Sequence, residues 1–279
     1  MHNEILTIGS VTIYGYGLMI GIGVIVAMLT GDKRANKRGL NGELVYGLTI
    51  TAVVLGFMAA KVLFIITNWS RFIKAPLDYL SSEGFVVYGG LFGGILAALG
   101  YCKIKKVSGF DYLDLMVPSV AIAQGFGRIG CFLAGCCYGR ETTSPLGVVF
   151  THSAFAPNNV RLIPTQLISS AGNFVIAAIL LWYASKPRKR FQTTILWILL
   201  YSIGRFFIEF LRNDARGNVG ALSTSQFIAI ICIPVCLLGF KFLVPALDKN
   251  TATESESLAD TTPAEANASA DTDTEIAHE

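Results

Sequence analysis

The chain has little charge and few histidines. Only 15% of its 279 residues are Asp, Glu, Lys or Arg, whereas 53% are hydrophobic, and the mean hydropathy is +0.56. This balance excludes an ordinary soluble domain. The three histidines, His2, His152 and His278, are scattered over a terminus, a loop and the tail. Since zinc ligands usually cluster, we predict no metal site and no cofactor.

Long apolar runs account for the composition. A helix that spans a bilayer needs about 20 mostly apolar residues, and seven stretches qualify. The basic residues follow the first stretch instead of preceding it, so we expect no cleavable signal peptide. The sequence predicts an all-α polytopic membrane protein with seven transmembrane helices, near Val11–Thr30, Glu43–Thr67, Phe85–Cys102, Tyr112–Cys136, Pro164–Ala184, Thr194–Leu211 and Ser223–Leu247.

Lys and Arg gather in every second loop. Short loops that are rich in them stay in the cytoplasm, so the N-terminus is expected outside, the C-terminus in the cytoplasm, and the protein in the bacterial plasma (inner) membrane as a multi-pass protein. The loops after the first, third and fifth runs hold Lys33, Arg34, Lys37 and Arg38; Lys103, Lys105 and Lys106; and Lys186, Arg188, Lys189 and Arg190.

The composition changes after Leu247. Residues 251–279 contain eight acidic residues and neither Lys nor Arg, a composition that cannot bury a core. We therefore expect a transmembrane domain over residues 1–247 and a disordered acidic cytoplasmic tail over 248–279. The basic remainder suits an anionic lipid bilayer as partner and predicts no nucleic-acid partner.

Arg128 is the polar residue that most needs explanation. It stays charged at physiological pH, and a charge at membrane depth costs at least ~2.5–3.5 kcal/mol. The nearest carboxylate on its helix, Asp114, belongs near the opposite membrane face. We expect an anionic lipid headgroup as its partner, held in a polar chamber of the outer leaflet to which six helices contribute, with Tyr16, Lys61, Tyr88, Arg128, Gln166 and Arg205.

A second set of charges lies on the sixth run. Arg205, Glu209 and Arg212 follow at steps of four and three, which places them on one helical face. Glu209 can bridge both arginines there. Two interpretations stay open for Glu209: a structural ion-pair row, or a part of the binding site.

Glycines allow close packing or backbone contact with a ligand. One group has the spacing that lets helices pack closely: Gly89, Gly90, Gly93 and Gly94. The other interpretation of these glycines is that they let the backbone approach a ligand. The segment 135–139 lies where the fourth helix should end. Glycines there, Gly139 included, can unwind the helix and expose amides for phosphate.

The six cysteines form two groups. Cys102, Cys232 and Cys236 lie in apolar surroundings and are predicted to be core residues. Cys131, Cys136 and Cys137 face the oxidising side, beside a cation. Three interpretations remain open for them: inert packing, a Cys131–Cys136 or Cys131–Cys137 disulfide, and a reactive thiol centre.

The run from Gly127 to Gly139 resembles the signature of the prolipoprotein diacylglyceryl transferases, which are seven-helix bacterial membrane enzymes. The other segments that match this family are Tyr14–Met19, Tyr88–Gly94, Pro164–Leu167 and Gly204–Arg212. The resemblance covers nearly the whole chain up to about Leu247. The order and spacing of the matched segments are specific to the family, whereas each segment alone is weak evidence.

The resemblance implies transfer of a diacylglyceryl group from phosphatidylglycerol to the lipobox cysteine thiol of an exported prolipoprotein, with release of glycerol-1-phosphate. Arg128 and Arg205 match family arginines that would hold the phosphate, and Tyr88 stands at the position of a family histidine. The remaining substrate-binding candidates are Tyr16, Gly89, Gly90, Gly139, Gln166 and Glu209.

The chain departs from the family pattern at four polar positions. Tyr88 replaces histidine, Cys131 replaces asparagine, and Cys136 and Ser169 replace glutamates. Two alternatives therefore stand beside the transferase. One is a membrane thiol–disulfide protein that uses Cys131, Cys136 and Cys137; the other is a lipid binder without chemistry.

Overall fold

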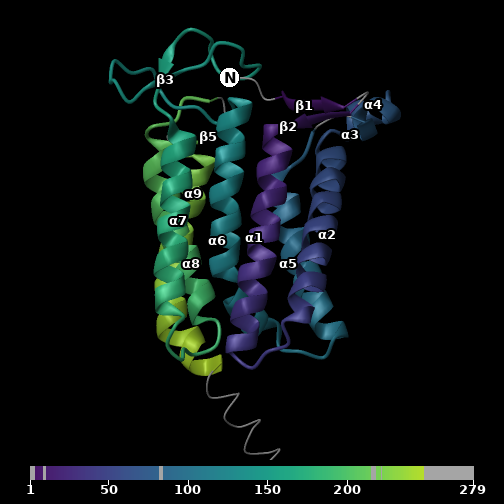
Figure 1. Cartoon of the computed structure of the whole chain (residues 1–279), viewed down its shortest axis with the longest axis vertical. Helices are drawn as coiled ribbons and strands as arrows, with labels where there is room; N and C mark the ends of the chain where they lie inside the picture. The colour runs from purple at the N-terminus through teal and green to yellow at the C-terminus, as the bar shows by residue number, and fades with distance from the viewer. Residues whose placement is uncertain (1–3, 9–10, 82–83, 215–217, 221, 248–279) are drawn as a thin grey trace, which may run out of the picture.

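Helices that run along one long axis form the molecule (Figure 1). The computed structural model describes residues 4–8, 11–81, 84–214, 218–220 and 222–247. The predicted acidic tail lies outside these residues. The long helices are α1 (Gly15–Lys37), α2 (Glu43–Thr67), α5 (Val87–Ile104), α6 (Gly109–Ala134), α7 (Thr165–Tyr183), α8 (Gln192–Glu209) and α9 (Thr224–Leu238), which the π-helix η1 (Gly239–Leu243) continues.

Six of the described helices are long and apolar enough to cross a membrane: α1, α2, α5, α6, α7 and the helical stretch Thr224–Leu247. The 18-residue α8 is not among them, although it runs alongside the others (Figure 1). The expected spans agree with the observed helices within a few residues, except for the first, where α1 starts four residues later than expected and extends beyond the expected end at Thr30 to Lys37.

Residues Val11–Tyr14, predicted to begin the first span, form a strand instead. This strand, β2, pairs antiparallel with β1 (Glu4–Ile8), and α1 starts only at Gly15. In β2, Val11, Thr12 and Ile13 alternate apolar, polar and apolar, which is the period of a strand and not of a helix. The prediction was wrong because the apolar content of the segment was weighed without its period.

The hairpins and two short helices gather at one end of the bundle, which we call the hairpin end (Figure 1). Besides β1 and β2, the described elements of this kind are β3 (Val148–Val149) with β4 (Arg161–Leu162), β5 (Asn218–Val219) with β6 (Leu222–Ser223), α3 (Trp69–Phe72) and α4 (Pro76–Ser81). The three lysine- and arginine-rich loops lie at the opposite end, since consecutive long helices alternate in direction.

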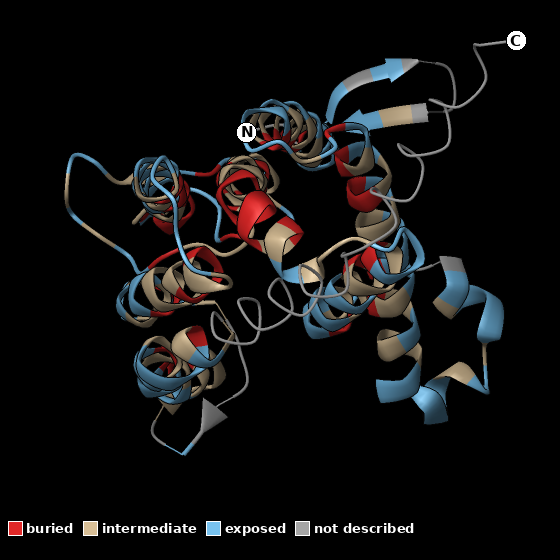
Figure 2. Cartoon of the chain, turned by 90° about the horizontal axis from the view of Figure 1, so that it is seen from below, coloured by how far each residue is buried: buried red, intermediate tan, exposed pale blue. Residues whose placement is uncertain are grey.

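Helix α6 is the centre of the bundle. It carries more buried residues than any other described helix, and buried positions face inward while exposed ones cover the outside (Figure 2). At the end opposite the hairpins, the Asp114 carboxylate of α6 accepts hydrogen bonds from the Thr194 amide at 2.7 Å and the Thr194 hydroxyl at 2.6 Å. Because these groups belong to the first turn of α8, the bonds fix the start of that helix against α6.

Candidate functional site

A pocket of about 270 Å³ lies between α6, α7 and α8. Its polar lining consists of Arg128, Ser169, Asn173, Tyr201 and Arg205, and most of the remaining wall is apolar. Arg128 comes six residues before the end of α6, which is about 9 Å along the axis from the hairpin end of that helix. The pocket therefore combines two guanidinium groups with an apolar wall, near one end of the bundle.

Arg128 faces a tyrosine of the neighbouring helix. Its guanidinium interacts electrostatically with the Tyr201 side chain of α8, which also lines the pocket. Tyr201 precedes Arg205 by four residues, so both side chains project from the same face of α8. This spacing makes Tyr201 and Arg205 approach Arg128 together.

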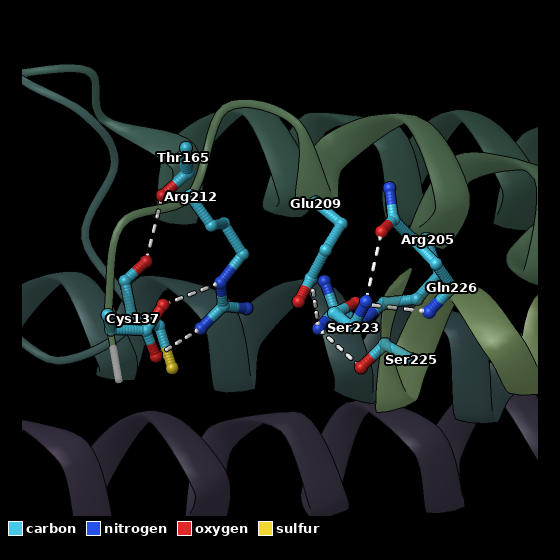
Figure 3. A network of polar contacts seen from close by, with 9 residues as sticks. Cys137, Thr165, Arg205, Glu209, Arg212, Ser223, Ser225 and Gln226 are labelled. Carbon is cyan, nitrogen blue, oxygen red and sulfur yellow. Dashed lines mark hydrogen bonds and ion pairs between the residues drawn. The ribbon is translucent and has the colours of Figure 1, made fainter. Parts of the chain in front are cut away.

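Arg205 is held from two sides and still has a free donor. Its Nη2 lies 2.6 Å from Glu209 Oε2 in an ion pair that is mostly buried, and the same nitrogen donates to the Ser225 hydroxyl of α9 at 2.9 Å. Figure 3 shows Glu209 and Ser225 on either side of the Arg205 guanidinium. Arg205 Nη1 is buried without a hydrogen-bond partner among the described residues, so it can bind an anion in the pocket.

Two glycines leave room in the pocket wall. Gly172 on α7 and Gly204 on α8 both line it, and a Cβ atom built at either position has no neighbouring atom within 4 Å. The absence of side chains here keeps space open instead of allowing helices to touch. Gly204 was part of the matched segment, but its role as pocket lining was not predicted.

Asn173 and Tyr201 were also missed as site residues. Asn173 lines the pocket, and its Oδ1 is buried with no hydrogen-bond partner in the described part of the chain. A polar amide in an otherwise apolar run, and a tyrosine four residues before a candidate arginine, were the available signals.

The end of α6 brings two thiols together. Gly135 has φ of +75° and ends the helix; its amide donates to the Phe132 carbonyl, and the Cys136 amide donates to the Cys131 carbonyl at 3.1 Å. This pair of hydrogen bonds is the Schellman motif, in which the side chains at the Cys131 and Cys136 positions commonly touch. The five-residue separation of the two cysteines thus fits the way this helix ends.

Cys137 completes the cluster. The sulfur atoms of Cys131, Cys136 and Cys137 lie within 4.8 Å of one another. The described structure contains no disulfide between Cys131 and Cys136 or Cys137. The sequence predicted no metal-binding group, but the fold has assembled three ligand-type atoms that sequence spacing alone did not indicate.

The loop that carries Cys136 and Cys137 is fixed by α7. Thr165 Oγ1 donates to the Cys137 carbonyl and Gln166 Nε2 to the Cys136 carbonyl, both at 2.8 Å. Figure 3 shows the first of these contacts. Cys137 adopts φ of +62°, which is uncommon for a residue with a side chain and needs support from its surroundings. Gln166, predicted to bind substrate, holds this loop.

Positive charge surrounds the Cys137 thiol. Hydrogen bonds with the Cys131 and Cys136 thiols hold the pKa of Cys137 below its usual range, and the charges of Arg212 and Arg128 add to this effect. Arg212 lies beside Cys137 in Figure 3, because the segment after α8 pairs with the segment after α6 through the bridge of Gly139 and Arg212.

The prediction that Glu209 bridges two arginines holds for Arg205 and is wrong for Arg212. Helix α8 ends at Glu209, so Arg212 leaves the shared helical face. It binds Asp214 instead, with Nε and Nη2 each 3.0 Å from a carboxylate oxygen.

The predicted phosphate-binding amides of residues 135–139 are largely used within the protein. The amides of Gly135 and Cys136 bond within the helix end, and that of Gly139 donates to the Ile163 carbonyl at 3.1 Å. A Cβ at Gly139 would lie 2.6 Å from that same carbonyl oxygen. Gly139 therefore allows two backbone segments to pack.

The other candidates do not line the pocket. Tyr88 is 43% exposed at the start of α5, and Gly89 and Gly90 face α2, where a Cβ at Gly89 would lie 2.7 Å from the Ala59 carbonyl oxygen. The Lys61 ammonium lies 5.3 Å from the Phe64 ring centroid and 5.2 Å from that of Phe85. These residues belong to the α2–α5 half of the bundle.

Tyr16 lies between the two halves, at the thiol side of α6. It is the second residue of α1, and a Cβ at Gly130 of α6 would lie 3.1 Å from its ring atom Cδ2. Of the residues predicted to form one outer chamber, the pocket gathers only Arg128 and Arg205.

Comparison with known proteins gives the family. A model of prolipoprotein diacylglyceryl transferase matches residues 3–243. The chain belongs to the prolipoprotein diacylglyceryl transferase family. Two similar relatives are the phosphatidylglycerol-prolipoprotein diacylglyceryl transferase of Clostridium tetani, 47% identical over 82% of this chain and 92% of its own length, and transferase 2 of that name from Clostridium perfringens, 47% identical over 79% and 87%.

A third relative, the phosphatidylglycerol-prolipoprotein diacylglyceryl transferase of Clostridioides difficile, is 31% identical over 83% of this chain and 91% of its own length. Members of this family are transferases, so family membership favours the transferase over the thiol–disulfide and lipid-binder alternatives. The matched region ends before the acidic tail.

Proposed function

We propose that the protein transfers a diacylglyceryl group from phosphatidylglycerol to the lipobox cysteine thiol of exported prolipoproteins. Family membership supports the reaction, because relatives that cover most of the chain bear the name of this activity. The observation that carries the assignment in this molecule is the pocket that brings Arg128 and Arg205 together beside apolar walls. A phospholipid has the same combination of an anionic group and hydrocarbon.

The donor lipid would enter from the side of the bundle. Ile168 of α7 and Phe207 and Leu211 at α8 line the pocket and are also exposed on the outer surface. Acyl chains can follow these side chains while the phosphate reaches the two arginines. Arg205 Nη1 would donate to a phosphate oxygen, which would satisfy a buried donor that otherwise has no partner.

The arginines would act on the departing group. The reaction forms a carbon–sulfur bond at the glycerol carbon and breaks the carbon–oxygen bond to phosphate, so negative charge grows on the leaving phosphate. Guanidinium groups fixed before the reaction stabilise that charge without reorganising. We assign this role to Arg128 and Arg205, with Tyr201 and Glu209 as the positioning residues that orient them.

Tyr88 would act elsewhere. Its exposure at the start of α5, in the half of the bundle formed with α2, suits contact with the prolipoprotein and not with the phosphate. Tyr16, close to the thiol cluster, is placed better to line the path between acceptor and donor.

We also propose that α8 is a seventh membrane span and that residues 1–247 form the catalytic domain, with the N-terminus outside the plasma membrane and the tail in the cytoplasm. Helix α8 lies beside α7 and α9 in the bundle (Figure 1). Seven antiparallel spans place all three basic loops on one side, as the charge rule requires.

Lipidation of a reporter prolipoprotein tests the function. In cells depleted of their own transferase, the full chain should attach diacylglycerol to the reporter cysteine, and Arg128→Ala should abolish this at equal expression. Arg71→Ala, which removes an exposed arginine of α3, is the matched control and should retain activity. An intact, well-expressed chain that leaves the reporter unmodified, or Arg128→Ala with full activity, would contradict the proposal.

A further inference from the structure

We propose that Cys131, Cys136 and Cys137 bind one Zn²⁺ ion through three thiolate sulfurs, and that the fourth coordination position accepts the cysteine thiol of the incoming prolipoprotein. The second half of this inference rests on the proposed transferase function. The first half concerns the chain alone.

The donor set fits zinc. Three sulfur atoms lie within 4.8 Å of one another, and sulfurs around a tetrahedral zinc with Zn–S bonds of about 2.3 Å are about 3.8 Å apart. Closing the cluster onto an ion thus needs a shift of about 1 Å or less. Thiolates select soft cations such as Zn²⁺ and Cu(I) over Mg²⁺ or Ca²⁺.

The local charge favours a divalent ion. Three thiolates with Zn²⁺ leave a net charge of −1, whereas Cu(I) would leave −2. Arg212 and Arg128 both act electrostatically on Cys137. One of them, Arg212, already has Asp214 as a bidentate partner, so the smaller residual charge of the zinc form suits the site better than that of the copper form.

The ligands are held in place before any ion binds. The Schellman motif fixes Cys136 against Cys131, and Thr165 and Gln166 hold the carbonyls of Cys137 and Cys136. Cys137 keeps a positive φ under these constraints. A metal site that is supported in this way by surrounding hydrogen bonds loses little entropy on binding.

Three protein ligands leave a coordination position open, which is the arrangement of a catalytic zinc site. Arg128 and Cys131 are three residues apart on α6, on one face of the helix. A thiol that binds the ion would lie on the cluster side of Arg128, with the donor pocket on its other side. Acceptor sulfur and donor phosphate would thus meet at Arg128.

Zinc would supply the activation that the acceptor thiol needs. A thiol that coordinates zinc loses its proton, here to solvent, and becomes a thiolate. Its sulfur electron pair then forms the bond to the glycerol carbon, while the carbon–oxygen bond breaks and its electron pair leaves with the phosphate. The thioether product is a weak ligand and leaves the ion free for the next thiol. No oxidant or reductant takes part.

Cobalt substitution tests the metal site without any activity assay. The purified, reduced full chain in detergent should bind one Co²⁺ per chain and develop sulfur-to-cobalt charge-transfer absorption, which equimolar Zn²⁺ should abolish. The variant with Cys131, Cys136 and Cys137 all changed to Ser should show no such absorption, whereas Cys232→Ser, which removes a thiol of α9, should keep it. Absence of the absorption in the intact chain, or its persistence in the triple variant, would overturn the site.

The open position has its own test. A lipobox peptide should change the spectrum of the cobalt-loaded protein, and the same peptide with Cys→Ser should not. An identical response to both peptides would overturn the role in thiol binding.

Activity separates this inference from the proposed function. Removal of the metal by a chelator should lower the rate of lipidation at least tenfold, and Zn²⁺ should restore it. Full lipidation by the metal-free chain would overturn the role of zinc and leave the transferase assignment intact. A chain that loads Co²⁺ and never lipidates the reporter would instead refute the transferase assignment, and the metal site would stand.

Discussion

Arg128 and Arg205 show how a buried charge is tolerated at the scale of single residues. Arg205 has Glu209 as its counter-ion, whereas Arg128 meets the neutral hydroxyl of Tyr201. A neutral partner offsets less of the cost of burying a charge than an anion does. Arg128 therefore keeps the stronger attraction for an anionic ligand, and Arg205 adds a free donor to the same ligand.

Tyr201→Phe tests the orientation of Arg128. A hydroxyl that holds a charged group in its reactive position by hydrogen bonding contributes about 1.5–3 kcal/mol, so if Tyr201 does this in the complex with donor lipid, kcat/KM for lipidation should fall about tenfold to a hundredfold. Tyr183→Phe removes a hydroxyl from α7 outside the pocket and should leave kcat/KM unchanged. Equal effects of the two substitutions would argue against a specific role for Tyr201.

Gly204→Val tests the space in the pocket. A Cβ at this position has no neighbouring atom within 4 Å, so the variant should fold and its new side chain should occupy volume that the lipid needs. Because one methylene in a pocket can change binding by roughly tenfold or more, the KM for phosphatidylglycerol should rise on the order of tenfold.

Gly21→Val is the control for that substitution. Gly21 on α1 has equally open surroundings and does not line the pocket. The KM of the Gly21→Val variant for phosphatidylglycerol should equal that of the unsubstituted protein. If Gly204→Val binds donor normally, the lipid lies elsewhere.

At the scale of elements, glycine has opposite uses on different helices. On α5, Gly89 and Gly93 allow α2 to approach, and a Cβ at Gly93 would lie 2.2 Å from the Ala59 Cβ. On α7 and α8, Gly172 and Gly204 leave the pocket open. The small-residue spacing in the sequence predicted the packing role on α5. It could not predict the pocket-lining role on α7 and α8, because open space around a glycine depends on the neighbouring helices.

Gly93→Ala should destabilise the contact of α2 and α5. Overpacking a tight interface costs about 1–3 kcal/mol, and we expect a lower thermal midpoint of the purified protein in detergent. Gly100→Ala on the same helix has open space around its Cβ; it should be neutral or stabilising, since alanine favours helix by about 1 kcal/mol over glycine. If Gly93→Ala had the same thermal midpoint as Gly100→Ala, the contact of α2 and α5 would have adjusted to the extra methyl group without loss of stability.

At the end of α6, the geometry of the helix end determined which amides are hydrogen-bonded and which thiols meet, and the sequence motif alone did not indicate either. Gly135 at the end of an apolar run predicted that the helix stops, and it does. The hydrogen bonds formed there hold the amides that were expected to bind phosphate. The same geometry turned three cysteines with no metal-site spacing into one cluster.

At the scale of the whole molecule, the alternation of long helices separates two surfaces. The hairpins lie at one end and the basic loops at the other (Figure 1). Arg128 of the pocket and the thiol cluster belong to the end of α6 that is nearest the hairpins. The charge rule assigns the basic end to the cytoplasm. The reacting groups would then face the side on which exported prolipoproteins arrive.

Phosphatase fusions test this topology. If the proposed orientation holds, fusions after residues 38 and 189 should be inactive, because their loops would be cytoplasmic, and fusions after residues 143 and 213 should be active. The pair at 189 and 213 flanks α8, so opposite activities require that α8 crosses the membrane. Equal activities at these two points would reduce the number of spans to the six helices that apolarity alone supports.

The sequence by itself determined the order and approximate limits of the long helices, since a bilayer demands long apolar runs. It also indicated Arg128 and Arg205, because a charge in an apolar run is costly wherever the helix lies. Only the tertiary structure decided which polar groups meet. Tyr201 and Asn173 joined the pocket, Tyr88 and Gly89 stayed with α2, and three thiols came together, because distances between helices depend on packing that no local pattern specifies.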